Sequence, residues 1–244
     1  MTRSVRKHLS EKGVGSRTGF RWRGGKEISR LEGFTDAVFA FAVTLLVVSL
    51  EVPKTYADLM EKMQGFVAFA ICFGLLFAIW YQQYVFFRRY GLEDLFVVWM
   101  NGILIFVVLF YVYPLKFLFT ILVDEIWGRP TPDITRAQMP QLFLIFSSGY
   151  VAVFLIFALL FGHAYRKRHE LELNVLERFD TRESIWSAVL QIAVGAASLV
   201  IAGLAPPRYA PWAGIVYLAN GPVQTIRGTV FGARRKRLER LANV

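Results

Sequence analysis

Charged side chains stand directly before a long apolar run near the start of the chain. Arg30, Glu32 and Asp36 come first, and residues 37–50 then contain almost no polar atoms. A carboxylate within a membrane span is costly, so it is usually paired or functional. Asp36 therefore either locks the start of a helix, by meeting the helix N-terminus, Arg30 or a partner on another helix, or it binds a proton or an ion. Its position close to the helix start favours the structural interpretation.

The apolar run carries a second pattern, a stripe along one helix face. Phe41, Thr44, Leu45 and Val48 follow the spacing i, i+3, i+4 and i+7, so they share one face of a helix. This stripe either packs against a neighbouring helix or lines a pore. Selection by carbonyl rings needs a loop like T-V-G-Y-G, which the sequence lacks, and few acidic residues are placed to form a charged ring. The remaining pore type is an apolar constriction that gates by losing water, with a hydroxyl ring at Thr44.

Signatures of enzymes and metal sites are absent from the sequence. It has no H-E-x-x-H pair, no phosphate-binding Walker loop, no G-x-S-x-G elbow and no cysteine–histidine cluster. We therefore expect no enzymatic activity, no cofactor and no resident metal. The single cysteine, Cys72, excludes a disulfide within the chain and is expected to be a small core residue.

The elements that carry these residues are predicted to be membrane helices. Of the 244 residues 55% are hydrophobic, more than a soluble domain of this length can cover, and the mean hydropathy is +0.44. The apolar runs are long enough to cross a bilayer, and in lipid each backbone must satisfy its own hydrogen bonds as a helix. The predicted fold class is all-α, a polytopic membrane protein with six transmembrane helices, at residues 33–51, 64–87, 96–121, 140–163, 185–205 and 210–230.

The formal charge of +10 is explained by membrane topology rather than by nucleic-acid binding. Basic residues gather in both tails and in alternate connections, which predicts that both termini are cytoplasmic. We divide the chain into a basic tail at 1–29, one six-helix domain at 30–231 and a second basic tail at 232–244. The first tail is expected to be solvated, with contact of Arg21, Trp22 and Arg23 with anionic lipid heads as the alternative.

Uncharged polar and small residues within the spans are expected to hold helices together. Gln83 and Asn101 carry amides that can bond across helices. Residues 195–198 read G-A-A-S, with Gly203 beyond, and offer a face for close helix packing. Pro114 should kink the third span.

The start of the first span resembles a known family. Residues 30–47 fit R-x-x-x-F-[ST]-D-A-V-F-A-x-A-x-T-L-L-V, which is similar to the first helix of the bacterial relatives of the endolysosomal potassium channel transmembrane protein 175. Threonine stands here where that family usually has serine. The positions that carry the resemblance are Arg30, Phe34, Thr35, Asp36, Trp80, Asn101 and Pro114.

This resemblance implies a homotetramer whose first helices line a central pore, which conducts potassium over sodium, weakly in the bacterial forms. The constriction would fall at Phe41, Leu45 and Val48, with Thr44 as the hydroxyl layer. The cytoplasmic-side polar network would consist of Arg30, Phe34, Thr35, Asp36, Trp80 and Gln83. The implied partners are other copies of the chain, membrane lipids and permeant K⁺ in a bacterial inner membrane, without nucleic acid and without metal beyond transient K⁺.

Two positions depart from the family pattern. Phe41 stands where the innermost constriction is usually isoleucine or leucine, so four phenylalanine rings would plug the pore or rotate to gate it. Gln83 replaces a histidine and removes a titratable partner of Asp36, although it still donates and accepts hydrogen bonds.

Two other function classes stay open at this point. A secondary transporter coupled to protons through Asp36 would be expected to show inverted repeats and broken helices near the midplane. The first span has no internal glycine or proline, which argues against it. A non-conducting structural or signalling membrane protein is the third class.

Overall fold

The computed structural model describes residues 20–24, 28–48, 53–128, 134–135 and 137–242, and these form helices joined by irregular connections. The α-helices are α2 (Arg30–Val48), α3 (Tyr56–Gln64), α4 (Phe66–Tyr90), α5 (Leu95–Ile126), α6 (Met139–Arg166), α7 (Val175–Leu204), α8 (Ala210–Ile215) and α9 (Asn220–Ala242). Two 3-10 turns, η1 (Pro207–Tyr209) and η2 (Val216–Ala219), flank α8. The all-α fold class predicted from the sequence is confirmed.

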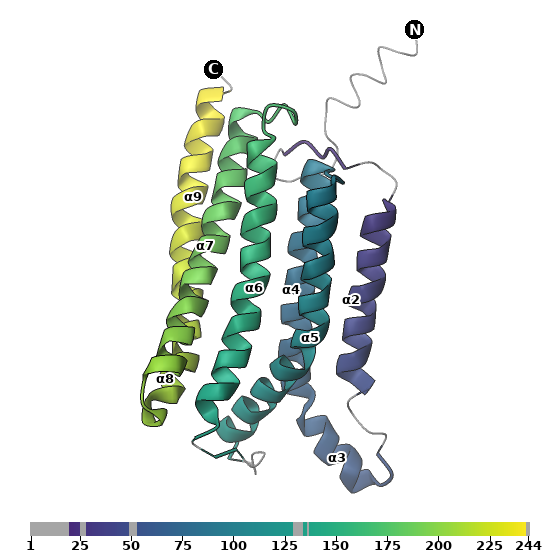
Figure 1. The fold of residues 1–244 in the computed structure, drawn as a ribbon, viewed down its shortest axis with the longest axis vertical. Coiled ribbons are helices and arrows are strands. Elements are labelled where there is room, and N and C mark those ends of the chain that lie inside the picture. The colour runs from purple at the N-terminus through teal and green to yellow at the C-terminus, as the bar shows by residue number, and fades with distance from the viewer. Residues whose placement is uncertain (1–19, 25–27, 49–52, 129–133, 136, 243–244) are drawn as a thin grey trace.

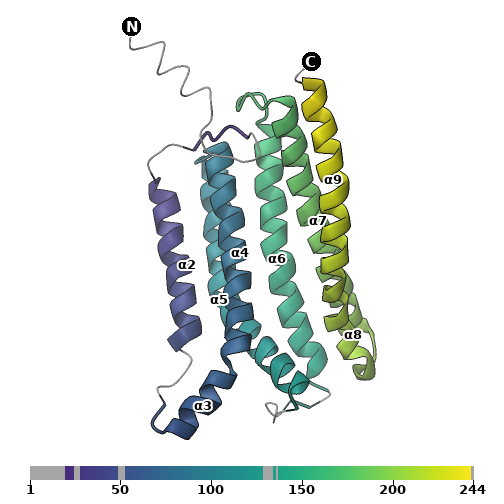
Figure 2. The same ribbon diagram turned by 180° about the vertical axis from the view of Figure 1, so that it is seen from behind.

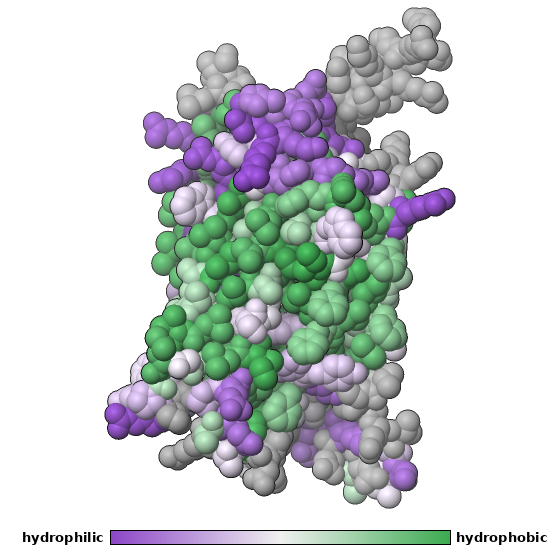
Figure 3. Space-filling model, in the orientation of Figure 1, coloured by the Kyte–Doolittle hydropathy of each residue, from purple (hydrophilic) through white to green (hydrophobic). Residues whose placement is uncertain are grey.

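The long helices lie side by side along the long axis of the molecule (Figure 1 and Figure 2). They are α2, α4, α5, α6, α7 and α9, and α9 ends at the same end of the molecule at which α2 begins. The short helices α3 and α8 lie toward the opposite end. Hydrophilic residues gather where α2 begins, above a broad hydrophobic belt (Figure 3). We call this the polar end.

Within the described residues, four helices are long and apolar enough to cross a membrane, namely α4, α5, α6 and α7. The chain is therefore a multi-pass membrane protein. The predicted first span corresponds to α2, whose first two turns hold Arg30, Glu32 and Asp36, and residues 49–51 of that prediction lie outside the described part of the chain. The second to fourth predicted spans correspond to α4, α5 and α6. Pro114 lies within α5, which bends in its second half (Figure 1).

The prediction of one continuous sixth helix at 210–230 is wrong. This segment is divided into α8, η2 and the first half of α9. Ser198 of α7 donates from its hydroxyl to the backbone carbonyl of Ala213 at 2.8 Å, and it also bonds Ser147 of α6 at 2.8 Å. A broken helix is tolerated within an apolar bundle where such side chains satisfy the backbone.

The fifth predicted span begins too late, because α7 starts at Val175 rather than at residue 185. Asn174 and Glu177 form a reciprocal capping box, in which each side chain accepts from the backbone N–H of the other residue. This cap starts the helix well before its apolar part. The hydropathy pattern therefore located the apolar part of α7 but not its polar first turns.

The start of α5 is capped by Asp94, whose carboxylate accepts from the N–H of Val97 at 3.1 Å. The same carboxylate lies 2.7 Å from Nε2 of His163 and 3.0 Å from Nζ of Lys167. Burial by itself raises the pKa of Asp94, but the hydrogen bonds from His163 and Lys167 outweigh it and hold that pKa well below its ordinary value. Asp94 therefore ties the start of α5 to the end of α6 as a carboxylate.

Among the described residues, α6 and α7 share the most extensive helix contact of the bundle. A methyl group built on Gly195 would approach Cγ2 of Val151 to 2.6 Å and Cδ1 of Tyr150 to 3.0 Å, so the small residue is needed there. The same group on Gly203, farther along α7, would meet Leu144 at an ordinary 3.7 Å. The predicted small-residue face therefore makes its close contact at Gly195. Cys72 is buried in the core, as expected.

We predict that Gly195→Ala lowers the melting temperature of the purified protein, whereas Gly203→Ala leaves it unchanged or raises it. Overpacking at a tight contact costs about 1–3 kcal/mol, while the gain in helix propensity from glycine to alanine returns at most about 1 kcal/mol. Thermal unfolding in detergent measures both variants against the parent chain. Equal melting temperatures for the two variants would contradict the close contact at Gly195.

Candidate functional site

Helix α2 packs against α4 and α5 with one face, and no other described part of the chain covers its opposite face. The buried face carries Thr35, Phe39, Ala42 and Leu46, each at most 4% exposed. On the opposite face Phe34 is 59% exposed and Phe41 is 55% exposed, and Ala37 and Thr44 are also exposed. Within a single chain, α2 thus shows an uncovered face along most of its length.

The residues of the predicted stripe lie mostly on this uncovered face. Phe41 and Thr44 are exposed and Leu45 is half-buried at its edge, whereas the side chain of Val48 lies outside the described part of the structure. The hydroxyl of Thr44 donates to the carbonyl of Ala40 at 2.9 Å. That bond uses the hydrogen of the hydroxyl. The lone pairs of the Thr44 oxygen therefore remain able to accept from water or to coordinate a cation.

A chain of buried hydrogen bonds joins α2 to α4 and α5. The hydroxyl of Thr35 donates to the carbonyl of Leu31 at 2.7 Å and accepts from Nδ2 of Asn101 at 2.7 Å. Oδ1 of Asn101 accepts in turn from Nε2 of Gln83. Thr35, Asn101 and Gln83 are each at most 2% exposed. Buried polar groups are costly without partners. This series of hydrogen bonds therefore holds α2 in one rotation about its own axis.

Asp36 has its partner on another helix. Its Oδ1 accepts from the indole N–H of Trp80 at 2.7 Å, which ties α2 to α4 one residue beyond Thr35. Among the described residues Arg30 forms no ion pair with Asp36, so the fold-back of Arg30 considered from the sequence is not observed. Arg30 and Phe34 are both exposed on α2. The structure thus brings together Thr35, Asp36 and Trp80 of the predicted network, but not Arg30 and Phe34.

A small open pocket of about 120 Å³ lies between the start of α2 and α4. Asp36, Trp80 and Gln83 line it, together with Glu32 and Arg88. Gln83 turns its amide nitrogen to Asn101 rather than to Asp36. Since an amide does not titrate, Gln83 and Asp36 do not form a proton-sharing pair. Within the part of the chain that the structure describes, no group of three or more histidine, cysteine, aspartate or glutamate side chains could hold a metal ion.

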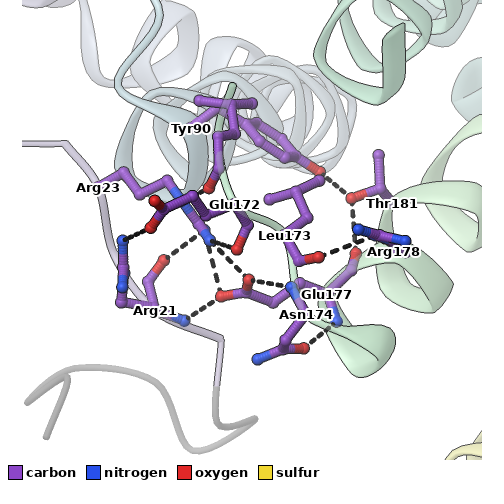
Figure 4. A network of polar contacts seen from close by, with 10 residues as sticks. Arg21, Arg23, Tyr90, Glu172, Leu173, Asn174, Glu177, Arg178 and Thr181 are labelled. Atoms are coloured by element: carbon purple, nitrogen blue, oxygen red, sulfur yellow. Dashed lines mark hydrogen bonds and ion pairs between the residues drawn. The ribbon is translucent and has the colours of Figure 1, made fainter. Parts of the chain in front are cut away.

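The N-terminal segment contains residues that the sequence patterns missed. The expectation of a solvated tail does not hold for residues 20–24, which pack against the polar end of the bundle (Figure 4). Phe20 is 2% exposed, and Arg23 forms an ion pair with Glu177 at 2.6 Å. The only sequence signal for this arrangement was the aromatic residues Phe20 and Trp22 among the charges of the tail, because Glu177 lies 154 positions from Arg23.

A family model and a curated relative both match this chain to potassium channels. The family model described as the endosomal/lysosomal potassium channel TMEM175 matches residues 30–111. A protein of Marivirga tractuosa named "Potassium channel" is 38% identical over 237 residues, which cover 92% of this chain and 96% of that protein. The chain is thus similar along nearly its whole length, whereas the resemblance noted from the sequence rested on motifs in the first three spans and on the predicted topology beyond them.

Solved structures show the same similarity in three dimensions. A crystal structure of a variant of the potassium channel MtTMEM175, in complex with a nanobody–MBP fusion protein, superposes with a TM-score of 0.78 at 37% identity and covers 90% of this chain and all of that one. A lysosomal potassium-selective channel TMEM175 homologue from Chamaesiphon minutus gives a TM-score of 0.52 at 20% identity, over 86% of this chain and 99% of that one. The second structure supports the fold alone.

The buried hydrogen bonds predict different outcomes for two threonines of α2. Thr35→Ala leaves Nδ2 of Asn101 without its acceptor and should destabilise the protein by about 0.5–2 kcal/mol, seen as a lower melting temperature in detergent. Thr44→Ala is the matched control, since Thr44 also donates to its own helix but is exposed. If both substitutions lower the melting temperature equally, the chain of bonds through Asn101 does not stabilise α2.

Proposed function

The chain belongs to the TMEM175 potassium channel family, not to a family of enzymes, and from this premise we propose that it forms a homotetrameric channel for K⁺ whose pore is lined by α2. The observation that carries the proposal is the uncovered face of α2, which presents Phe41 and Thr44 outward while the opposite face is bonded to α4 and α5. One copy of α2 cannot enclose a pore. Several copies arranged around an axis would cover this face and form the lining.

The proposed neck of the pore is apolar. Phe41, Leu45 and Val48 form its constriction, and Thr44 supplies a ring of hydroxyl oxygens between them. An apolar neck of this kind controls passage by wetting and dewetting, because a cation crosses it only with part of its water shell or with oxygen atoms that replace it. The hydroxyl ring at Thr44 is the group in the neck that can replace water. The proposed preference for K⁺ over Na⁺ is weak, as the resemblance to the bacterial members of the family implies.

The proposed topology has six crossings with both ends of the chain on the cytoplasmic side. α2 provides the first crossing, and α8, η2 and α9 together provide the sixth; the four apolar helices lie between them. The alternating course of the long helices supports this topology, since α2 begins and α9 ends at the polar end (Figure 1). The basic segments 1–29 and 232–244 then face the cytoplasm, as positive charge does near the ends of membrane spans. The membrane is proposed to be a bacterial inner membrane.

In this proposal the polar network has a structural role. Thr35 and Asp36 hold the inner end of α2 against Asn101 and Trp80, so that the lining face keeps one direction along the pore. Arg30 and Phe34 are exposed on α2 near the same end and are proposed to meet neighbouring copies. Asp36 would then be a carboxylate that orients a helix, not a carrier of protons.

The function is tested with purified protein in liposomes that hold K⁺ or Na⁺. We expect K⁺ flux that exceeds Na⁺ flux and rises linearly with the driving force, as passive conduction requires. Saturable flux coupled to a proton gradient, and lost in Asp36→Asn, would instead establish a proton-coupled secondary transporter. An absence of flux from correctly assembled tetramers would refute both.

Phe41→Ala is expected to raise the K⁺ conductance several-fold in bilayer recordings, because removing four rings from the neck widens it and makes it easier to wet. Phe110→Ala is the matched control. Phe110 is 71% exposed on α5, a helix that the proposal places outside the pore, so its loss should leave conductance unchanged. A conductance of Phe41→Ala that equals or falls below that of the parent chain would show that Phe41 does not line the neck.

A further inference from the structure

Residues 20–24 form a clasp across the polar end of the bundle, which we call the N-terminal clasp. Phe20 is buried, with its ring edge-on to Tyr90 of α4 at 5.7 Å between centroids, and the guanidinium of Arg89 lies 4.9 Å above it. Trp22 packs edge-on against Tyr84 of the same helix at 6.4 Å. The clasp therefore has its own apolar anchor in the bundle.

Arg23 is the polar centre of the clasp (Figure 4). Two of its terminal nitrogens donate to the two carboxylate oxygens of Glu177, at 3.1 Å and 2.6 Å. Its Nε donates to the carbonyl of Leu171 at 2.7 Å, and a terminal nitrogen also reaches the carbonyl of Glu172 at 3.2 Å. The side chains of Arg23 and Glu177 are only 10% and 2% exposed. Such a two-pronged buried pair has one geometry, which a lysine in place of the arginine cannot reproduce.

Glu177 joins three segments through this single carboxylate. Its Oε1 accepts from the backbone N–H of Arg21 at 2.8 Å, and its Oε2 accepts from that of Asn174 at 3.0 Å, which is the capping bond of α7. The clasp, the α6–α7 connection and the first turn of α7 are thus held at one point. Removal of the charge on Glu177 would leave the buried Arg23 without its counter-charge.

The clasp is also bonded to the end of α4. The backbone N–H groups of Arg23 and Gly24 donate to the carbonyl of Arg88 at 3.1 and 3.2 Å. A Cβ on Gly24 would lie 2.7 Å from the carbonyl oxygen of Phe87. Gly91, with a φ of +59°, would likewise bring a Cβ within 2.9 Å of the carbonyl of Arg23. The two chain segments therefore pass at a separation that only glycine permits.

The clasp lies a short distance along the chain from α2. Gly24 precedes the first residue of α2, Arg30, by six positions (30 − 24), which reach at most about 20 Å when extended. Ser29 and Glu32 cap that start reciprocally, at 3.2 Å and 3.1 Å. A short stretch of chain therefore connects the clasp to the capped first turn of α2.

We propose that the N-terminal clasp positions the inner end of the pore helix, with Arg23 and Glu177 as its positioning residues. This inference rests on the proposed function, in which the uncovered face of α2 lines the pore. The clasp is bonded to α4 and α7 and restrains the start of α2 from outside, whereas the polar network ties α2 directly to α4 and α5 one turn farther along. A released helix end would let the exposed apolar faces of neighbouring α2 helices close on one another, since burial of apolar side chains between them excludes water from the neck.

The test compares Glu177→Gln with Glu172→Gln in full-length protein. Glu172 forms an ion pair with Arg21 of the clasp at 3.8 Å, and the side chains of Glu172 and Arg21 are 79% and 49% exposed. Because this pair is exposed, Glu172→Gln is the matched control. Amide hydrogen exchange of residues 30–36 and K⁺ flux in liposomes are measured, with tetramer assembly followed by size-exclusion chromatography. We expect Glu177→Gln to speed exchange in residues 30–36 and to lower K⁺ flux several-fold, while Glu172→Gln changes neither.

Arg23→Lys serves as the milder variant if Glu177→Gln fails to assemble. It keeps the positive charge but loses the two-pronged geometry. We expect it to show the same changes to a smaller extent. If either variant only lowers the melting temperature, with α2 exchange and flux like the parent chain, the clasp stabilises the fold without positioning the helix, and the proposal is overturned. A parent chain without flux would refute the proposed function, whereas the exchange measurement would still test the clasp.

Discussion

The side-chain amide of Asn101 joins the three helices on which the arrangement of α2 depends. It donates to Thr35 of α2 and accepts from Gln83 of α4, while it stands on α5 itself. Rotation of α2 about its own axis would strand these groups in an apolar interior, where no water can replace the lost partners. The amide therefore decides which face of α2 is buried. As a consequence it also decides that Phe41 and Thr44 stay exposed within the single chain.

The same need for internal partners explains the irregular end of the bundle. Ser147 and Ser198 share a hydrogen bond between α6 and α7, Ser198 reaches the carbonyl of Ala213 in α8, and the hydroxyl of Tyr217 in η2 donates to Ser147. The interrupted segment of α8 and η2 is thus hydrogen-bonded to the continuous helices α6 and α7. Helices with uniform apolar surfaces would pack here without such bonds, but they would not specify where the break falls.

The apolar runs predicted α4, α5 and α6 to within a few residues, because a bilayer demands a fixed length of apolar helix. The period of the helix placed Phe41 and Thr44 on one face of α2 from their spacing alone. Prediction from the sequence failed for Phe20 and Arg23, which looked like part of a solvated basic tail. It also began α7 too late, because the capping box at Asn174 and Glu177 lies in a polar stretch that hydropathy does not count.

The sequence by itself determined the membrane class of this protein and the periodic face of α2, since these follow from composition and from spacing along one helix. Only the tertiary structure decided which polar groups meet. Asp36 bonds Trp80 rather than Arg30, and Arg23 finds Glu177 at a separation of 154 positions. The physical reason is that hydrogen bonds and ion pairs select partners by distance and angle in space, and helix packing sets these for residues that no local pattern connects.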